Sequence, residues 1–119
     1  MNPVELKNRV QKLSYAGLKI ALVLPQKQAL SNLIRLEIVK MASQMAIQAM
    51  GLYQGQLSHT FLDNLNEAKN QANGFLYWLQ LVQSEKMLDS KIIDPLIAET
   101  EQIIQMYIKA FKTLKNKLD

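Results

Sequence analysis

The stretch Ser31–Met50, SNLIRLEIVKMASQMAIQAM, determines how the rest of the chain is interpreted. At helical spacing, Ile34, Ile38, Met41 and Met45 form one apolar stripe, and further apolar residues fill most of the remaining circumference. A helix that is apolar nearly all round is buried nearly all round, whereas three neighbouring helices of a small protein cover only one side of it. The sequence therefore predicts that a second copy of the chain, or a partner protein, covers the other side. The residues expected at that interface are Leu36, Val39, Met45, Ala46 and Met50.

The composition indicates a single domain spanning residues 1–119, with 49% hydrophobic and 20% charged residues. The charged share is slightly below the usual ~25%, which fits extra buried surface. The chain contains no cysteine, which excludes disulfides, thiolate zinc sites and cysteine nucleophiles and suits a cytoplasmic protein. The start, MNPVELKNRV, lacks a basic region followed by an apolar core, so no secretory signal is expected. Glutamines and glycines interrupt the charge-free stretch 41–60, so no membrane helix is expected either.

Apolar residues recur at spacings of three and four along four segments, and no segment alternates at period two long enough for a strand. The helices are expected at about residues 2–24, 29–50, 58–83 and 94–118. Asn2-Pro3 and Asp94-Pro95 each combine a capping side chain with a proline that suits the first helical position, and Ser58 is a third expected cap. Gly51 is the expected stop of the second helix. Short links between long helices predict an all-α, antiparallel, up-down-up-down four-helix bundle.

Positive charge gathers near both ends of the sequence, and the formal net charge is +4. In an antiparallel bundle the start of the first helix lies beside the end of the fourth, so cations from both are expected to meet there. Like charges placed together repel unless an anion shares them, and phosphate is the commonest such anion. The alternative interpretation is an ordinary solvated lysine-rich surface. The cations of this end are Lys7, Arg9, Lys12, Lys109, Lys112, Lys115 and Lys117.

The residues that carry catalysis or bind metals are nearly absent. His59 is the only histidine and lies beside the expected cap of the third helix, where a surface position is the ordinary outcome. A di-iron bundle needs Glu-x-x-His pairs, but Gln56 stands three residues before His59. No phosphate-binding glycine loop, nucleophile-base pair or pair of facing carboxylates is recognisable. We therefore expect no enzymatic activity, no metal and no cofactor.

Three segments together resemble the bacterial four-helix-bundle protein superfamily: LPQKQALSNLIR (24–35), FLDNLNEAKNQANGFLYWLQLV (61–82) and KIIDPLIAETEQIIQMYIKAFKTLK (91–115). That superfamily includes proteins encoded in 23S ribosomal RNA intervening sequences and the accessory variability determinants of diversity-generating retroelements. The apolar second helix, the basic first and last helices and the segment around Trp78 look more like the retroelement protein. Arg35 is followed by Leu36, where intervening-sequence proteins typically carry a second arginine.

The resemblance implies a homopentamer without enzymatic activity that binds nucleic acid (RNA or an RNA/DNA hybrid) with low sequence specificity. It also implies association with the reverse transcriptase of the retroelement. One alternative is an intervening-sequence-type protein that acts as a structural or protein-interaction module. Another is a membrane-surface protein that uses the basic first helix. The residues expected to contact the nucleic-acid backbone are Arg9, Lys12, Lys19, Arg35, Lys109, Lys112 and Lys115.

Overall fold

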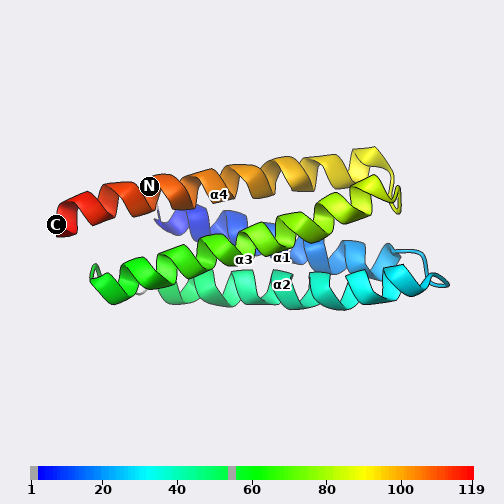
Figure 1. The fold of residues 1–119 in the computed structure, drawn as a ribbon, viewed down its shortest axis with the longest axis horizontal. Coiled ribbons are helices and arrows are strands. Elements are labelled where there is room, and N and C mark those ends of the chain that lie inside the picture. Colours follow the sequence, from blue (N-terminus) through cyan, green and yellow to red (C-terminus); the bar gives the residue numbers. More distant parts are fainter. Residues whose placement is uncertain (1–2, 54–55) are drawn as a thin grey trace.

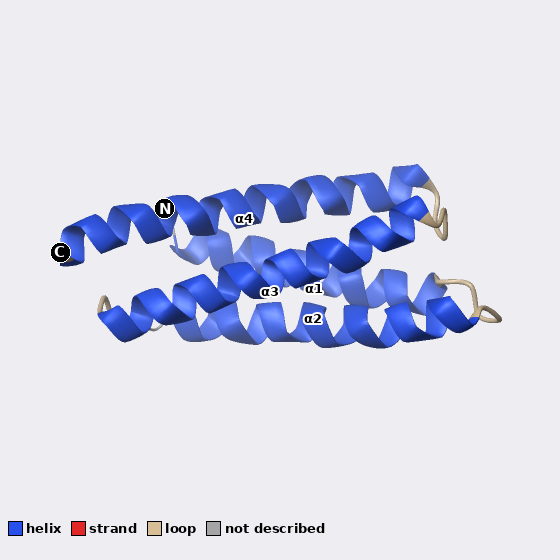
Figure 2. Ribbon diagram, in the orientation of Figure 1, coloured by secondary structure: helices blue, strands red, loops and turns tan. Residues whose placement is uncertain are grey.

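The computed structural model describes residues 3–53 and 56–119, and these residues form four helices and no strand. The helices are α1 (Pro3–Val23), α2 (Ala29–Tyr53), α3 (His59–Ser84) and α4 (Ser90–Leu118). They lie side by side along the long axis of a molecule measuring 51 × 21 × 19 Å (Figure 1). Helices account for nearly all of the ribbon, and loops are confined to the ends of the molecule (Figure 2). The predicted all-α class is therefore confirmed.

Each helix packs against its neighbours in the chain, and α1 also packs against α4. The contacts are most extensive for α1–α2 and α3–α4 and least extensive for α1–α4. Later residues of α1 contact earlier residues of α2. Gly17 lies against Ala42, whereas Ala21, further along α1, accepts a hydrogen bond from Arg35. The same ordering relates α2 to α3, because Met41 lies against Gly74 whereas Gln48, further along α2, donates a hydrogen bond to the Asn64 carbonyl. These contacts are compatible with the predicted antiparallel bundle.

The predicted helix boundaries hold at three points. Pro3 is the first residue of α1, although Asn2, its expected cap, lies outside the described residues. Ser58 caps α3, because its side chain accepts a hydrogen bond from the Phe61 backbone N–H at 3.0 Å. The link beginning at Pro25 separates α1 from α2, as expected.

Two predicted boundaries are wrong. Gly51 does not end α2, which continues to Tyr53, because Gly51 has no positive φ and fits the helix. The fourth helix begins at Ser90 rather than at Pro95, since the Asp89 side chain accepts a hydrogen bond from the Lys91 backbone N–H at 2.9 Å and acts as the cap. Pro95 therefore lies inside α4. Asp94 caps nothing, and its carboxylate instead accepts a hydrogen bond from the Gln83 side-chain amide at 2.8 Å.

Backbone N–H groups in the turn from α3 into α4 donate hydrogen bonds to carbonyls at the end of α3. The backbone N–H of Met87 donates to the Val82 carbonyl, and that of Lys86 donates to the Gln83 carbonyl. This pair of bonds is a Schellman motif, which requires a left-handed residue after the cap. Lys86 supplies that residue with a φ of 53°.

The core is built from the predicted inward stripes. The apolar stripe of the first segment is buried, both in α1 (Leu6, Val10, Leu13, Gly17 and Ile20) and at Leu24 just after it. The stripe of α3 is buried from Leu65 to Val82, with Phe61 half-buried. Gly17 marks a close helix approach, as expected, because a Cβ there would lie 2.8 Å from Cζ of Phe75. The fourth predicted stripe is buried at Ile97, Ile104 and Tyr107 and half-buried beyond them, from Phe111 to Leu118.

Candidate interaction surfaces

The outward face of α2 is apolar along most of its length. Leu36 is 69% exposed, Ile47 is 68% exposed and Met50 is 50% exposed, and Val39 lies on the same side. Lys40 is the one charged residue between Leu36 and Met50 that is exposed on this face. Large contiguous apolar patches on a protein surface often mark interaction sites.

The first helix widens this apolar face. Tyr15 is 61% exposed and Leu22 is 74% exposed, and neither belongs to the buried stripe of α1. The contacts Gly17–Ala42 and Arg35–Ala21 set the register of the two helices. In that register Tyr15 is level with the middle of α2 and Leu22 with its first half. We define the α1–α2 apolar face as Tyr15, Leu22, Leu36, Val39, Ser43, Ala46, Ile47 and Met50.

One residue of the predicted interface does not reach this face. Met45 is only 2% exposed and belongs to the hydrophobic core of the bundle. Its position, seven residues after the buried Ile38, places it on the inward stripe. Leu36, Val39 and Met50 are exposed and Ala46 is half-buried, so these four lie where the prediction requires.

Sequence reasoning missed Ile47, Tyr15 and Leu22. The sequence did contain a signal for the two α1 residues, since each is a large apolar side chain outside the apolar stripe of the first helix. Ile47 follows Ser43 by one helical turn and belongs to neither of the apolar groups that the pattern emphasised.

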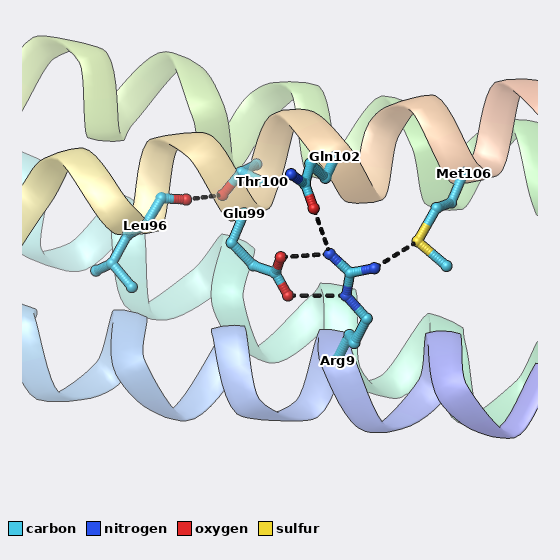
Figure 3. Close-up of polar contacts among 6 residues, drawn as sticks. All are labelled: Arg9, Leu96, Glu99, Thr100, Gln102 and Met106. Atoms are coloured by element: carbon cyan, nitrogen blue, oxygen red, sulfur yellow. Dashed lines mark hydrogen bonds and ion pairs between the residues drawn. The ribbon is translucent and has the colours of Figure 1, made fainter.

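Arg9, predicted to contact phosphate, pairs instead with residues of α4. Its guanidinium forms a two-pronged ion pair with Glu99 of α4, with Nη2 to Oε1 at 2.5 Å and Nε to Oε2 at 3.0 Å (Figure 3). It also donates to Oε1 of Gln102 at 2.8 Å and to the sulfur of Met106. The hydrogen bonds to the Glu99 carboxylate raise the pKa of Arg9 above its ordinary value. The Arg9 guanidinium therefore links α1 to α4, and these contacts leave it little capacity to bind phosphate.

The Arg35 guanidinium also forms its hydrogen bonds within the chain. Its Nε donates to the carbonyl of Ala21 at 2.8 Å, and its Nη2 donates to the carbonyl of Leu24 at 3.0 Å. Its Nη1 donates to Oδ1 of Asn32 at 2.8 Å. The last carbonyls of a helix have no partner within the helix, and cationic side chains commonly satisfy them. Arg35 therefore caps the end of α1, and this structural role leaves it little capacity to bind phosphate.

The five remaining predicted cations are exposed lysines: Lys12, Lys19, Lys109, Lys112 and Lys115. Within residues 3–53 and 56–119, none of them has a carboxylate at ion-pair distance. Lys115 lies over the ring of Phe111, with Nζ 6.0 Å from its centroid. The end of α4 projects beyond the start of α1 along the long axis (Figure 1). The lysines of α1 and α4 therefore share one end of the molecule only in part.

An acidic residue also lies at this end. Glu5 lines a cavity of about 340 Å³ together with Lys109 and Lys117. The Glu5 carboxylate thus lowers the net positive charge at this end, and the ion pair with Glu99 neutralises Arg9, one of the expected cations.

The described part of the chain contains no cluster of three or more histidine, aspartate or glutamate residues that could hold a metal ion. His59 is exposed at the first position of α3. None of the four described helices combines the length and the apolar character that crossing a membrane requires. Comparison of the chain with protein-family models, with curated proteins and with solved structures gave no match.

Proposed function

We propose that this chain is a non-enzymatic, cytoplasmic accessory protein that assembles with copies of itself and binds the backbone of RNA or DNA. In this proposal it is an up-down-up-down bundle that serves a diversity-generating retroelement and associates with the reverse transcriptase of that element. The assembly is supported by the α1–α2 apolar face. Nucleic-acid binding is supported by a single observation, the five exposed lysines that have no carboxylate partner among the described residues. The retroelement context comes from the sequence resemblance.

A backbone-binding surface predicts affinity that depends steeply on salt and weakly on sequence, because each lysine that neutralises a phosphate releases counterions. The probes are labelled single-stranded RNA, single-stranded DNA and an RNA/DNA hybrid, measured by fluorescence anisotropy across a salt series. The double variant Lys12→Ala/Lys112→Ala is expected to weaken binding to all three probes similarly. Its slope of log affinity against log salt should flatten by about two units, roughly one per lysine.

The matched control is Lys27→Ala/Lys91→Ala, which removes the same charge from exposed positions in the α1–α2 link and at the start of α4. These two segments lie at the end of the molecule opposite to both termini (Figure 1). Binding by this control should stay within about twofold of the wild type. An unchanged slope in the Lys12/Lys112 variant, or an equal loss in the control, would contradict the proposed surface.

Self-assembly is tested separately by light scattering. The resemblance implies five copies, and any assembly of the 13.6 kDa chain gives a mass at a multiple of that value. The double variant Leu36→Asp/Ile47→Asp places two charges on the α1–α2 apolar face and should give the monomer mass. A wild-type protein that is monomeric at micromolar concentration would contradict the proposed assembly.

A second candidate function is an intervening-sequence-type structural or protein-interaction module. The observation that favours it is the internal use of both predicted arginines, Arg9 by Glu99 and Arg35 by the end of α1. This function requires assembly but predicts no affinity for nucleic acid at moderate salt. The anisotropy measurement therefore distinguishes the two.

A further inference from the structure

Tyr15 stands between two lysines on the outer surface of α1. Its side chain is 61% exposed. Lys12 precedes it by three residues and Lys19 follows it by four, so all three lie on the same side of the helix. Both lysines are exposed, and neither has a carboxylate at ion-pair distance within residues 3–53 and 56–119. We define the α1 tyrosine row as Lys12, Tyr15 and Lys19.

Negative charge is absent from the sequence around this row. Between Glu5 and Glu37 the chain holds six cations and no acidic residue. On the neighbouring helix α4, Glu99 is paired with Arg9, and Asp94 accepts a hydrogen bond from a side chain of α3. A ligand that neutralises the two lysines of the row must therefore bring its own negative charge.

The exposed ring of Tyr15 sets a second requirement on the ligand. The ring offers a flat apolar surface, which a strand with unstacked bases can cover because every base has a π-face. In a duplex the bases are stacked on one another, so the phosphates are accessible but no base face is free for the ring. An acidic peptide supplies negative charge, but its carboxylates offer the ring no flat partner.

We infer that the α1 tyrosine row binds single-stranded nucleic acid, with Tyr15 stacked on a base and the two lysines on phosphates to either side of that base. This inference rests on the nucleic-acid binding proposed above and names the single strand as its ligand. Lys12 and Lys19 are separated by about 10.5 Å along the helix axis, with the ring between them. That separation leaves room for the stacked base between two contacted phosphates.

Tyr77 of α3 provides the contrast. It is 58% exposed, nearly as much as Tyr15, but its ring packs edge-on against Trp78, with the ring centroids 5.0 Å apart. The residues three and four positions to either side of it are uncharged: Asn73, Gly74, Gln80 and Leu81. A base stacked on Tyr77 would therefore have no lysine one turn away to bind its phosphates.

The row forms the α1 edge of the α1–α2 apolar face, and the two proposals use different parts of that face. The test of self-assembly substitutes Leu36 and Ile47, which lie on α2. A protein contact that covered Tyr15 would also remove the ammonium groups beside it from water, which carries a desolvation cost unless carboxylates pair with them. A single strand supplies phosphates for both groups and leaves the α2 part of the face free for assembly.

The decisive comparison is between strands with and without bases. The probes are labelled oligo(dT), an abasic strand of the same length that keeps every phosphate, and the duplex of oligo(dT) with oligo(dA), each measured by fluorescence anisotropy across a salt series. Tyr15→Ala should weaken binding to oligo(dT) at least about fivefold, because it removes the stacking surface. Its binding to the abasic strand and to the duplex should change by less than about twofold. The slope of log affinity against log salt should stay the same, because no charge is lost.

Two further variants complete the test. Tyr15→Phe keeps the ring and should bind oligo(dT) within about twofold of the wild type. The matched control is Tyr77→Ala, which removes a tyrosine of similar exposure and should also stay within about twofold. Circular dichroism and light scattering check that each variant keeps its helices and the wild-type mass.

Three outcomes would contradict the inference. A loss in Tyr15→Ala that is as large on the abasic strand, or no loss on oligo(dT), would overturn the stacking and leave the proposed nucleic-acid binding standing. A loss accompanied by a change in mass would assign the effect to assembly and overturn the inference as well. A wild-type protein that binds none of the three probes would overturn both the inference and the proposed nucleic-acid binding.

Discussion

The outer faces of α2 and α4 differ in chemistry although both helices bury an apolar stripe on the inside. The outer face of α2 presents Leu36 and Ile47 to solvent, whereas that of α4 presents Glu101, Gln105 and Lys109. The core is complete in both cases, because the residues that pack inward belong to the buried stripes. The apolar outer face of α2 is therefore not needed to form the fold of the single chain. Its exposure works against solubility, and the self-assembly proposed above would remove it from water.

The first prediction compares the two sides of α2 directly. Met45→Ala removes a fully buried side chain and should lower the free energy of unfolding by about 2–5 kcal/mol. Leu36→Ala removes an exposed one and should change the stability of the single subunit by no more than about 0.5 kcal/mol. Urea denaturation in an Ile47→Asp background, where assembly is suppressed, measures both. Equal losses would remove the distinction between an inner and an outer face.

The second prediction compares two glycines at helix contacts. Gly17→Ala places a Cβ 2.8 Å from Phe75, which is fully buried, and should cost about 1–3 kcal/mol of stability by overpacking. In Gly74→Ala the new Cβ meets only the terminal methyl of Met41, which is flexible and half-buried and can move aside. That variant should gain up to about 1 kcal/mol from helix propensity. Thermal unfolding of both variants tests the pair, and a gain in Gly17→Ala would show that Phe75 has room to shift.

The third prediction concerns the inner face of α4. Burial raises the pKa of Tyr107 to about 12, above its ordinary value near 10. The folded state then holds its phenolic proton where the unfolded state releases it, so stability is unaffected below pH 10 and falls as the pH rises through 12. The loss attributable to Tyr107 is about 1.4 kcal/mol per pH unit in that window. Tyr107→Phe should be less sensitive to pH there, as followed by urea denaturation between pH 9 and 11.5. Parallel curves for the wild type and Tyr107→Phe would contradict the assignment.

The fourth and smallest effect is expected at the contact between α1 and α4, which joins the α1–α2 pair to the α3–α4 pair. Arg9→Leu breaks the ion pair with Glu99, whose two side chains are 27% and 33% exposed, and should cost about 1 kcal/mol at low salt. A double-mutant cycle with Glu99→Gln measures the coupling, which should shrink as salt is added. Lys12→Leu, one turn further along α1 and without a carboxylate partner, is the matched control. A coupling of zero would show that the ion pair adds nothing to the packing of this seam.

The inward stripes could be predicted from the sequence because local spacing alone decides them. Residues three and four apart share one side of a helix, so the pattern of apolar residues assigns Leu6 to Leu24 and Leu65 to Val82 to the core. The cap at Ser58 was likewise a local signal. The start of α4 was misplaced because two acidic residues, Asp89 and Asp94, both suit a cap, and only the hydrogen bonds formed show which one serves.

The sequence by itself determined four helices, their buried stripes and the surplus of apolar surface on α2, since each follows from periodicity within one segment. Only the tertiary structure decided which cations remain for a ligand and which apolar residues face out. Arg9 meets Glu99 across 90 residues of sequence, and Arg35 reaches the end of α1. These outcomes depend on the register and rotation that packing sets between helices, and no periodicity within a single helix contains them.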